Sequence, residues 1–306
     1  MSFCIVSAAD ARYFECLLGL VDSLYALAAP IVVVDLGMSA EQRAQLESKG
    51  VRLASFSYPL SYPARPQVEA AFPGFGAMLC RPYLNEIVPG YETLVWLDAD
   101  AWAQQPSAVL ELMEHGRRSG LAAVPEVDRG YFKFTDGSHV WGVEAEGLRR
   151  LFGPEIASRM MHVPVINSGV WAARSQSPLW PAWRRYLQEG LARISVVDDL
   201  TRTVEQGAFN VAIRLERIPV QRFPATYNWL ACLALPAWHA GRSALVDPNP
   251  PHDRIRILHV SAHLVGKSVM LPVLHGTADR VGPVMLTRQG IEALKLSNRP
   301  RPAAAC

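Results

Sequence analysis

The first 58 residues alternate between short apolar segments and helical patterns, and this alternation constrains the fold more than any other feature of the chain. Three apolar runs predict buried strands, at 3–9, 30–37 and 51–58. Residues 13–27 have helical periodicity, and Ser39 with Gln42 three positions later predicts an N-capped helix that Gly50 ends. Strands that alternate with helices pair in parallel through right-handed crossovers. The sequence therefore predicts an α/β fold with a doubly wound, mostly parallel sheet.

The segment TLVWLDADAW, residues 93–102, places two carboxylates directly after a buried apolar run. Ligands of such sheets bind at the carboxyl ends of the strands, which is where this prediction puts Asp98 and Asp100. With one residue between them, both side chains lie on the same side of an extended chain. Mg²⁺ and Mn²⁺ prefer carboxylate oxygens, so the pair predicts a divalent-cation site. The spacing alone is also compatible with a solvated strand end.

Composition and charge exclude several classes of protein. The chain has 306 residues, and its 30 basic and 28 acidic residues give a formal charge of +2, without a Lys or Arg block of the kind that binds nucleic acid. No basic segment precedes the first apolar stretch and no apolar run reaches about 18 residues, so we expect no signal peptide, no transmembrane segment and a cytoplasmic location. Five scattered cysteines without a Cys-x-x-Cys pair indicate free thiols.

Beyond residue 100 the patterns are shorter. Helices are expected at 106–120, 178–193 and 200–214, and strands at 121–127, 217–228 and 255–260. The apolar block 163–174 is interrupted by Asn167, Ser168 and Gly169, residue types that turn or pinch a strand. Residues 131–139 predict an irregular loop of the kind that holds substrates.

For the organisation of the chain we expect a single domain over residues 1–298. The regular alternation of strands and helices belongs to its first part, up to about residue 127, and the second part begins at about residue 128. Residues 299–306 have no hydrophobic pattern, which predicts a flexible tail.

Five short motifs in the right order make the chain resemble the GT-A glycosyltransferases, and within them family 8, the type related to glycogenin and bacterial lipopolysaccharide galactosyltransferases. The motifs are IVSAADARYF at 5–14, LNEIVPGYETLVWLDAD at 84–100, INSGVWAAR at 166–174, EQGAFN at 205–210 and YNW at 227–229. The resemblance implies a Rossmann-like nucleotide-binding half, at about residues 1–127, and a smaller mixed donor and acceptor half, at about residues 128–298. It also implies transfer of a hexose-type sugar from a nucleotide-diphosphate sugar, a UDP-sugar, to an acceptor with retention of configuration.

The resemblance further implies which residues bind the donor and the metal. Those expected at the nucleotide are Ser7, Ala8, Asp10, Tyr13 and Ala99. Those expected to hold Mn²⁺ or Mg²⁺ are Asp98, Asp100 and His259. The expected phosphate-binding cations are Arg81 and Lys267. Metal and cations would stabilise the negative charge that develops on the departing diphosphate.

Three residues are expected at the sugar itself. Asn167 and Gln206 offer amide groups suited to sugar hydroxyls, and the resemblance places Gln206 nearest the reacting face. Asp199 is the third, although Asp198 and Asp199 also fit a cap at a helix N-terminus.

The chain departs from the family pattern in two places. The family ends with His-x-x-Gly-x-x-Lys-Pro-Trp, whose His is the third metal ligand, whereas this chain reads HVSAHLVGKSV from His259. His259 and His263 are both candidates for that ligand, and we favour His259 because it ends the predicted strand. Glu205 and Gly207 stand where the family has Asp, so the polar role of those positions is altered.

Two other functions stay open on the sequence alone. A haloacid-dehalogenase-like phosphohydrolase also carries Asp-x-Asp after a buried strand, with the first Asp as nucleophile, but Trp102 fills its Thr or Val position. A nucleotide-sugar-binding protein without turnover would account for the altered His motif. The residues identify neither the sugar nor the acceptor, which we expect to be a glycan, lipid or protein. Arg299 and Arg301 in the tail are compatible with weak peripheral membrane association.

Overall fold

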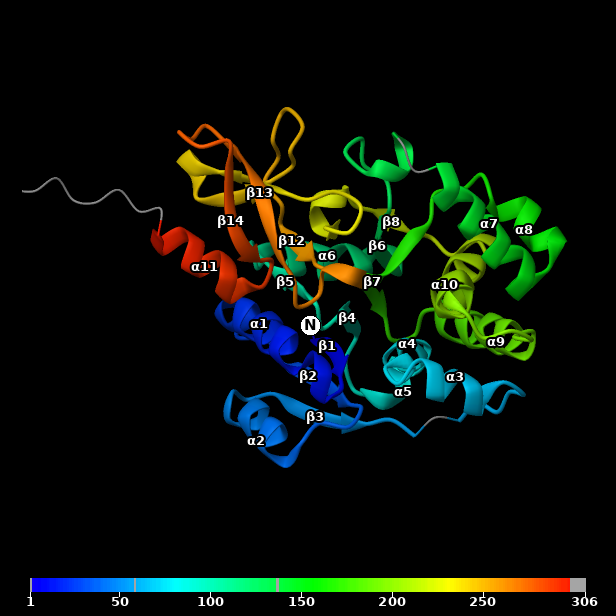
Figure 1. Ribbon diagram of the computed structural model, residues 1–306. Coiled ribbons are helices and arrows are strands. Elements are labelled where there is room, and N and C mark those ends of the chain that lie inside the picture. The colour runs from blue at the N-terminus through cyan, green and yellow to red at the C-terminus, as the bar shows by residue number, and fades with distance from the viewer. Residues whose placement is uncertain (1, 58, 136–137, 298–306) are drawn as a thin grey trace, which may run out of the picture.

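The computed structural model describes residues 2–57, 59–135 and 138–297, and its main element is a seven-stranded sheet (Figure 1). The strand order is β3-β2-β1-β4-β7-β6-β8. These strands are β1 (Phe3–Ala9), β2 (Ile31–Asp35), β3 (Arg52–Ser55), β4 (Thr93–Leu97), β6 (Leu121–Pro125), β7 (Ile166–Arg174) and β8 (Gln221–Arg222). Within it β7 runs antiparallel to both of its neighbours, and the other pairs are parallel, as predicted for a mostly parallel sheet.

Helices cover both faces of this sheet (Figure 1). They include α1 (Phe14–Leu24), α2 (Ala40–Ser48), α3 (Arg65–Ala71), α4 (Phe75–Cys80), α5 (Leu84–Ile87), α6 (Ser107–Ser119), α7 (Ser138–Phe152), α8 (Pro154–Met160), α9 (Leu179–Ala192), α10 (Val204–Leu215) and α11 (Arg288–Ser297). Short 3₁₀ turns that matter for the site are η1 (Ala11–Tyr13), η3 (Arg81–Tyr83), η4 (Phe132–Phe134), η5 (Asp199–Thr203) and η8 (Ala262–Leu264).

The strands are apolar throughout because alternate side chains enter two different cores. In β1, Cys4 and Val6 belong to the core shared with α9 and α10, whereas Ile5 belongs to the core shared with α1 and α6. All three side chains are fully buried, and burying one such side chain contributes roughly 1.5–3 kcal/mol. A central strand buried on both faces therefore needs apolar residues at successive positions.

The predicted βαβαβ start is confirmed. β1 pairs in parallel with β2, and β2 pairs in parallel with β3. At the start of α2 the Ser39 hydroxyl accepts the Gln42 backbone N–H at 3.2 Å, and the Gln42 side chain accepts the Ser39 N–H at 2.9 Å. This reciprocal capping box satisfies two backbone donors that the first turn leaves free.

The position of β4 determines where a ligand can bind. The chain leaves β1 toward β2 and β3 on one side, and then returns to place β4 on the other side of β1. Such a reversal opens a crevice at the carboxyl ends of the two diverging strands. Asp10 follows β1 and Asp98 follows β4, so both lie at this crevice.

Three predicted elements differ from the structure. Residues 217–228 do not form one strand, because Pro219 and Pro224 lack the N–H that a paired strand donates; β8 is two residues long and is followed by a 3₁₀ turn and β9 (Trp229–Leu230). The predicted loop 131–139 is cut short because α7 begins at Ser138; residues 136–137 lie outside the described ranges. The block 163–174 is a single strand, β7.

The pinch predicted in that block takes the form of a register shift. Opposite β6, Ala123 pairs with Trp171, whereas the next residue, Val124, pairs with Asn167. The intervening residues 168–170 therefore bulge out of the ladder, which redirects the side chains at the end of β7.

Two smaller sheets complete the fold. β5 (Ala101–Ala103), which follows the Asp-x-Asp turn, pairs antiparallel with β12 (Ile257–His259), and β12 pairs with β9. The other sheet comprises β10 (Ala237–His239), β11 (Ala244–Val246), β13 (Ser268–Leu274) and β14 (Arg280–Met285). Across the described ranges, every helix is too short or too polar to traverse a bilayer. The predicted tail, with Arg299 and Arg301, falls outside those ranges.

Candidate active site

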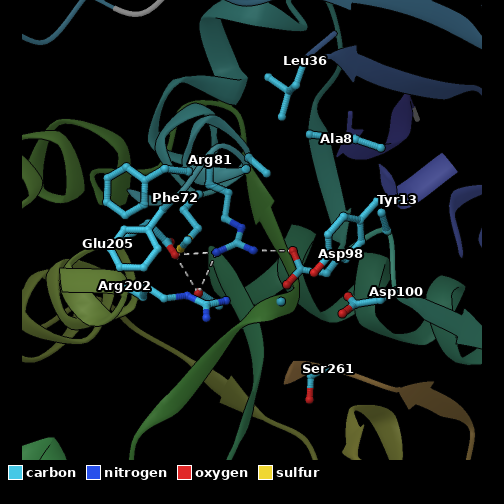
Figure 2. Close-up of a pocket in the computed structure, with 18 of the residues that line it drawn as sticks. Ala8, Tyr13, Leu36, Phe72, Arg81, Asp98, Asp100, Arg202, Glu205 and Ser261 are labelled. Carbon is cyan, nitrogen blue, oxygen red and sulfur yellow. Dashed lines mark hydrogen bonds and ion pairs between the residues drawn. The ribbon is translucent and has the colours of Figure 1, made fainter. Parts of the chain in front are cut away.

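A cavity of about 510 Å³ lies where β1 and β4 end, bordered by α4, η5 and the start of α10 (Figure 2). Most of the predicted site residues line it: Ala8, Asp10, Tyr13, Arg81, Asp98, Ala99, Asp100, Asn167, Gln206 and His259. These residues come from segments spread over most of the chain. The structure thus brings the Asp-x-Asp turn, the first loop and the later motifs to a single cavity.

Asp98, Asp100 and His259 form a group at this cavity. One ligand atom from each lies within 4.8 Å of the others, and His259 Nε2 is 3.2 Å from Asp100 Oδ1 and 3.7 Å from Asp98 Oδ2. The pairing of β12 with β5, which sets His259 opposite Ala101, brings the histidine to the acidic turn. The alternative ligand His263 lies exposed in η8.

The orientation of the His259 ring is fixed from its other nitrogen. Nδ1 lies 3.0 Å from Asn228 Oδ1, while Asn228 Nδ2 donates to Asn167 Oδ1 at 2.9 Å. Because Asn228 uses its NH₂ group on Asn167, its oxygen faces the ring, and Nδ1 must carry the hydrogen. Nε2 is left to face the two carboxylates.

The charges of this group are strongly coupled. Burial lowers the pKa of His259, but the negative charges of Asp100 and Asp98 outweigh burial and raise that pKa above its ordinary value of 6.5. Burial raises the pKa of Asp100, but the facing His259 outweighs burial and lowers that pKa. The buried carboxylate of Asp100 and the partly buried carboxylate of Asp98 therefore attract positive charge to the position in front of Nε2.

The residues fit a divalent cation at that position. Two carboxylates and one imidazole are a donor set used by Mn²⁺ and Mg²⁺ or related ions. A Cβ atom on Gly169 would lie 2.6 Å from Asp98 Oδ2 and 2.5 Å from His259 Cε1, so the absence of a side chain at 169 keeps the space beside the ligands open. Asp98, Asp100 and His259 would hold the ion, leaving further positions for water and ligand oxygens.

Arg81 lies between Asp98 and Glu205 (Figure 2). It contacts Asp98 Oδ1, whereas His259 faces Asp98 Oδ2. Its two terminal nitrogens pair with these two carboxylates, and Nη1 also donates to Ser168 Oγ at 3.1 Å. The guanidinium is buried and its carbon lies 5.3 Å from the centre of the Trp96 ring. The residue expected to bind phosphate is therefore engaged by two protein carboxylates.

Glu205 is a buried carboxyl group at the cavity whose pKa is strongly raised. Burial, with a contribution from nearby Asp98, raises its pKa to about 7 in spite of the opposing charge of Arg81. Its Oε2 accepts from Ser168 Oγ at 3.0 Å, whereas its buried Oε1 has no hydrogen-bond partner among the described residues. Glu205, at the position where the resemblance leads one to expect Asp, is therefore a buried partner of Arg81 at the wall of the cavity and is not a solvated carboxylate.

The two predicted amides form a second cluster with an unpredicted carboxylate. Glu126 Oε1 accepts from Asn167 Nδ2 at 2.9 Å and from Gln206 Nε2 at 3.1 Å. Gln206 Oε1 accepts the backbone N–H of Ser168 at 3.1 Å. Lys133 donates to the other oxygen of Glu126 at 3.0 Å. Both amides are therefore held in one orientation.

The loop after β1 supplies one wall of the cavity. Asp10 caps η1 by accepting the Arg12 N–H at 2.9 Å, and it also pairs with the Arg12 guanidinium. Tyr13 is half-buried between this loop and the acidic turn, where burial, with the charge of Asp100 adding, raises the pKa of its hydroxyl. Arg12 and Arg202 also line the cavity.

Three predicted site residues do not line the cavity. The Ser7 side chain is buried in β1 and its hydroxyl has no partner within the described part of the chain. Asp199 is exposed at the start of η5, whose cap is the neighbouring Asp198. Lys267 is exposed just before β13. Their assigned roles stay predictions.

Three functional candidates were not predicted from the sequence: Arg202, which lines the cavity, and Glu126 and Asn228, which hydrogen-bond to the lining residue Asn167. Glu126 directly follows the buried strand β6, the same signal that identified Asp98, but the predicted strand 121–127 ran two residues beyond Pro125 and therefore included Glu126. Asn228 lies within the YNW motif, which was noted without assigning it a role. Arg202 precedes the EQGAFN motif by one helical turn, but nothing in the local sequence distinguishes it from a surface arginine.

Comparison with known proteins gives a structural relationship. No protein-family model and no curated protein matches the chain. Among solved structures, the galactosyltransferase LgtC in complex with donor and acceptor sugar analogs is similar at 16% identity, with 98% of both chains covered and a TM-score of 0.55. An active-site mutant of LgtC is similar at 17% identity, with the same coverage and a TM-score of 0.54.

A third structure, the apo form of the glycosyltransferase GlyE of Streptococcus pneumoniae TIGR4, is similar at 14% identity with a TM-score of 0.50. This comparison covers 96% of the present chain and 60% of that protein. Together the similarities show that the chain has the GT-A glycosyltransferase fold, as the sequence motifs predicted.

Proposed function

We propose that the protein is a metal-dependent glycosyltransferase that moves a hexose-type sugar from a nucleotide-diphosphate sugar, a UDP-sugar, to an acceptor with retention of configuration. The observation that carries this proposal is the group Asp98, Asp100 and His259, whose ligand atoms lie within 4.8 Å of one another at the ligand-binding crevice of a GT-A fold. LgtC, which has the same fold, was solved with donor and acceptor sugar analogs, and this supports a two-substrate transfer reaction.

The two halves of the cavity suit the two parts of such a donor. The loop with Asp10 and Tyr13 borders the end of β1, where a nucleotide would lie, and the acidic group faces the position of its diphosphate. A bound divalent cation would neutralise charge on the departing diphosphate. Arg202 lines the same cavity with its guanidinium carbon 5.7 Å from the centre of the Phe72 ring, and we assign it as a phosphate-binding cation in addition to the predicted ones.

The amide cluster suits the sugar. Gln206 and Asn167 present polar groups to the cavity from α10 and β7, and their fixed orientation pre-organises them for sugar hydroxyls. The carboxylate nearest to Gln206, that of Glu126, is fully occupied by three donors. A carboxylate so occupied is a poor general base, which supports a reaction that does not need one, as retention implies.

This arrangement favours a transferase over the two alternatives. A phosphohydrolase of the haloacid-dehalogenase type needs Asp98 free as a nucleophile, whereas here its Oδ1 is held by Arg81 and by Trp96 Nε1 at 2.8 Å. A binding protein without turnover was suggested by the altered His motif, but all three residues of the ligand group are present in this chain, which removes that reason to expect a lost activity.

Thermal-shift measurements across a panel of nucleotide sugars, with and without Mn²⁺, test the proposal. We expect one donor to raise the melting temperature of the wild type in a Mn²⁺-dependent way, because a ligand that binds only the folded state stabilises it. Asp100→Ala should abolish the metal-dependent part. Asp22→Ala, which breaks an exposed pair with Lys49, should leave it intact. The absence of any donor-dependent shift in the wild type would refute the proposal.

Sugar release or transfer from the stabilising donor, measured by product analysis, then separates an enzyme from a binding protein. Retention is tested by the anomeric configuration of the product.

A further inference from the structure

We propose that Glu126 is a positioning residue: it sets the direction of a hydrogen-bond chain that runs through Asn167 and Asn228 to His259, and thereby fixes the His259 tautomer whose free Nε2 faces the metal position. The inference rests on the proposed function in assuming that a cation binds in front of that nitrogen. The hydrogen-bond chain itself is independent of any substrate.

The chain starts at a group that can only accept. Glu126 is 8% exposed, and three donors surround its carboxylate: Lys133 Nζ at 3.0 Å on Oε2, and Asn167 Nδ2 at 2.9 Å and Gln206 Nε2 at 3.1 Å on Oε1. Lys133 is 2% exposed, so this ion pair is shielded from water. A carboxylate in such surroundings has no hydrogen to give, which defines the polarity of every bond that follows.

Each later member passes this polarity on. Because the NH₂ group of Asn167 is turned to Glu126 and to Gln206 Oε1, its oxygen faces Asn228 and accepts Nδ2 at 2.9 Å. The Gly169 backbone N–H donates to the same Asn167 oxygen at 2.9 Å and so agrees with this orientation. The oxygen of Asn228 is then turned to His259 Nδ1, 3.0 Å away, which has to donate.

The amides and the imidazole have no preferred direction of their own, since each can rotate or exchange its donor and acceptor ends. In the reversed chain His259 would carry its hydrogen on Nε2, and that hydrogen would occupy the position in front of Asp98 and Asp100. Metal binding requires the opposite tautomer, and the partner of the distal ring nitrogen selects it. The buried carboxylate of Glu126, which is connected to His259 through the side chains of Asn167 and Asn228, makes that selection.

The anchor of the chain lies in the segment predicted to hold substrate. Lys133 belongs to η4, and it also contacts Glu144 Oε1 of α7 at 3.3 Å, while its backbone oxygen accepts Trp141 Nε1 at 2.9 Å. Displacement of this segment would loosen Glu126 and, through it, both Gln206 and His259. The same buried ion pair therefore organises the sugar-facing amide and the metal ligand.

The test compares Glu126→Gln with the matched control Glu144→Gln. Both replace a carboxylate on Lys133 by an amide of equal size, but only Glu126 contacts the two site amides. The NH₂ group of a glutamine at 126 must face either Lys133 or the side chains of Asn167 and Gln206. In both cases it meets a hydrogen-bond donor, so one bond of the wild type is lost. The first readout is the protonation pattern of the His259 ring, from ¹⁵N NMR of the metal-free proteins at alkaline pH. The second is the Mn²⁺ affinity, from electron paramagnetic resonance titration.

We expect the hydrogen on Nδ1 in the wild type and in Glu144→Gln. In Glu126→Gln we expect a population with the hydrogen on Nε2 and a loss of Mn²⁺ affinity of about 10-fold or more, the usual range for residues that orient a ligand. Adding Asn228→Asp to Glu126→Gln should restore the Nδ1 hydrogen, because a carboxylate at 228 can only accept from the ring. A purely structural role of Glu126 predicts no such rescue.

An unchanged His259 tautomer together with unchanged Mn²⁺ affinity in Glu126→Gln would overturn the inference. If that variant does not fold, Asn228→Leu removes the last link before His259 and is expected to lower Mn²⁺ affinity, whereas Glu144→Gln keeps the wild-type tautomer and affinity. Equal Mn²⁺ affinity of Asn228→Leu and the wild type would again overturn the inference. A wild type that binds neither Mn²⁺ nor any nucleotide sugar refutes the proposed function instead, and the tautomer measurement still decides the inference.

Discussion

Two clusters of charged side chains share Asp98, and they differ in what balances their negative charge. On one side, Asp98 Oδ1 and Glu205 are held by Arg81, a permanent cation that is itself buried. On the other side, Asp98 Oδ2 and Asp100 face His259, which is charged only when protonated. We call these the arginine cluster and the histidine cluster.

The difference separates carboxylates that build the site from carboxylates that are available to a ligand. In the arginine cluster the balancing cation, Arg81, keeps its charge at any working pH, so the carboxylate oxygens it holds have little to offer a further cation. In the histidine cluster the balancing proton can leave, and a divalent cation can replace it. Breaking the first cluster should therefore damage the fold, whereas breaking the second should damage metal binding.

Arg81→Leu should have the largest effect, on stability. It would leave Glu205 buried without its cation, and breaking a buried pair by removing one partner costs about 3–5 kcal/mol. Arg12→Leu, which breaks a pair whose arginine is 54% exposed, should cost less than about 1 kcal/mol. The free energy of unfolding from urea denaturation checks both; equal losses would contradict the division into two clusters.

Glu205→Gln should alter how stability depends on pH. Because the pKa of Glu205 is raised from 4.5 to about 7, mainly by burial, the folded protein holds this proton more tightly than the unfolded chain. The resulting stability is fully present below pH 4.5 and is lost as the pH rises through 7, by about 3 kcal/mol from this group. Urea denaturation at several pH values should show a smaller loss across this window in Glu205→Gln than in the wild type; parallel curves would exclude the shift.

Gly169→Ala should break the histidine cluster without changing a charge. The added methyl group would lie 2.6 Å from Asp98 Oδ2 and 2.5 Å from His259 Cε1, so the ligands must separate. We expect Mn²⁺ affinity to fall about 100-fold, the upper range for disturbed ligand orientation. Gly142→Ala is the control, since a Cβ atom there meets nothing within 4 Å. Isothermal titration with Mn²⁺ measures the effect, and wild-type affinity in Gly169→Ala would argue against a metal at this position.

Arg202→Ala should have the smallest effect, and one that belongs to neither cluster. Arg202 is exposed and lines the cavity, so its loss should leave stability unchanged and raise the KM for the donor roughly 5- to 10-fold, as expected for one charge-assisted contact of about 1 kcal/mol. Arg214→Ala, at the exposed last turn of α10 and outside the cavity lining, is the control. Steady-state kinetics with varied donor concentration measure the KM. An equal rise of KM in both variants would mean that the loss of a positive charge, rather than a contact of Arg202 with the donor, causes the effect.

Much of the structure of the first 100 residues followed from local sequence. β1 was predicted with its observed bounds, the capping box of α2 was predicted by residue, and the buried run before Asp98 placed both carboxylates at a strand end. These features depend on the burial of successive side chains and on hydrogen bonds within four residues, so a short segment contains the information that specifies them. Residues 217–228 were misassigned because the apolar pattern was read without the two prolines that interrupt it.

The partners of the charged groups were decided by tertiary structure. The sequence identified Arg81 as a cation but not its two carboxylates. It favoured His259 over His263 from the predicted strand end, but only the pairing of β12 with β5 showed that His259 lies beside Asp98 and Asp100. It also contained nothing that linked Glu126 to His259. The sequence therefore determined which segments fold into strands and helices and which carry ligand-type residues. Which of those residues meet, and in which protonation state, depends on strand pairing across the whole chain and on burial, because the energies of buried charges and hydrogen bonds are set by neighbours far away in sequence.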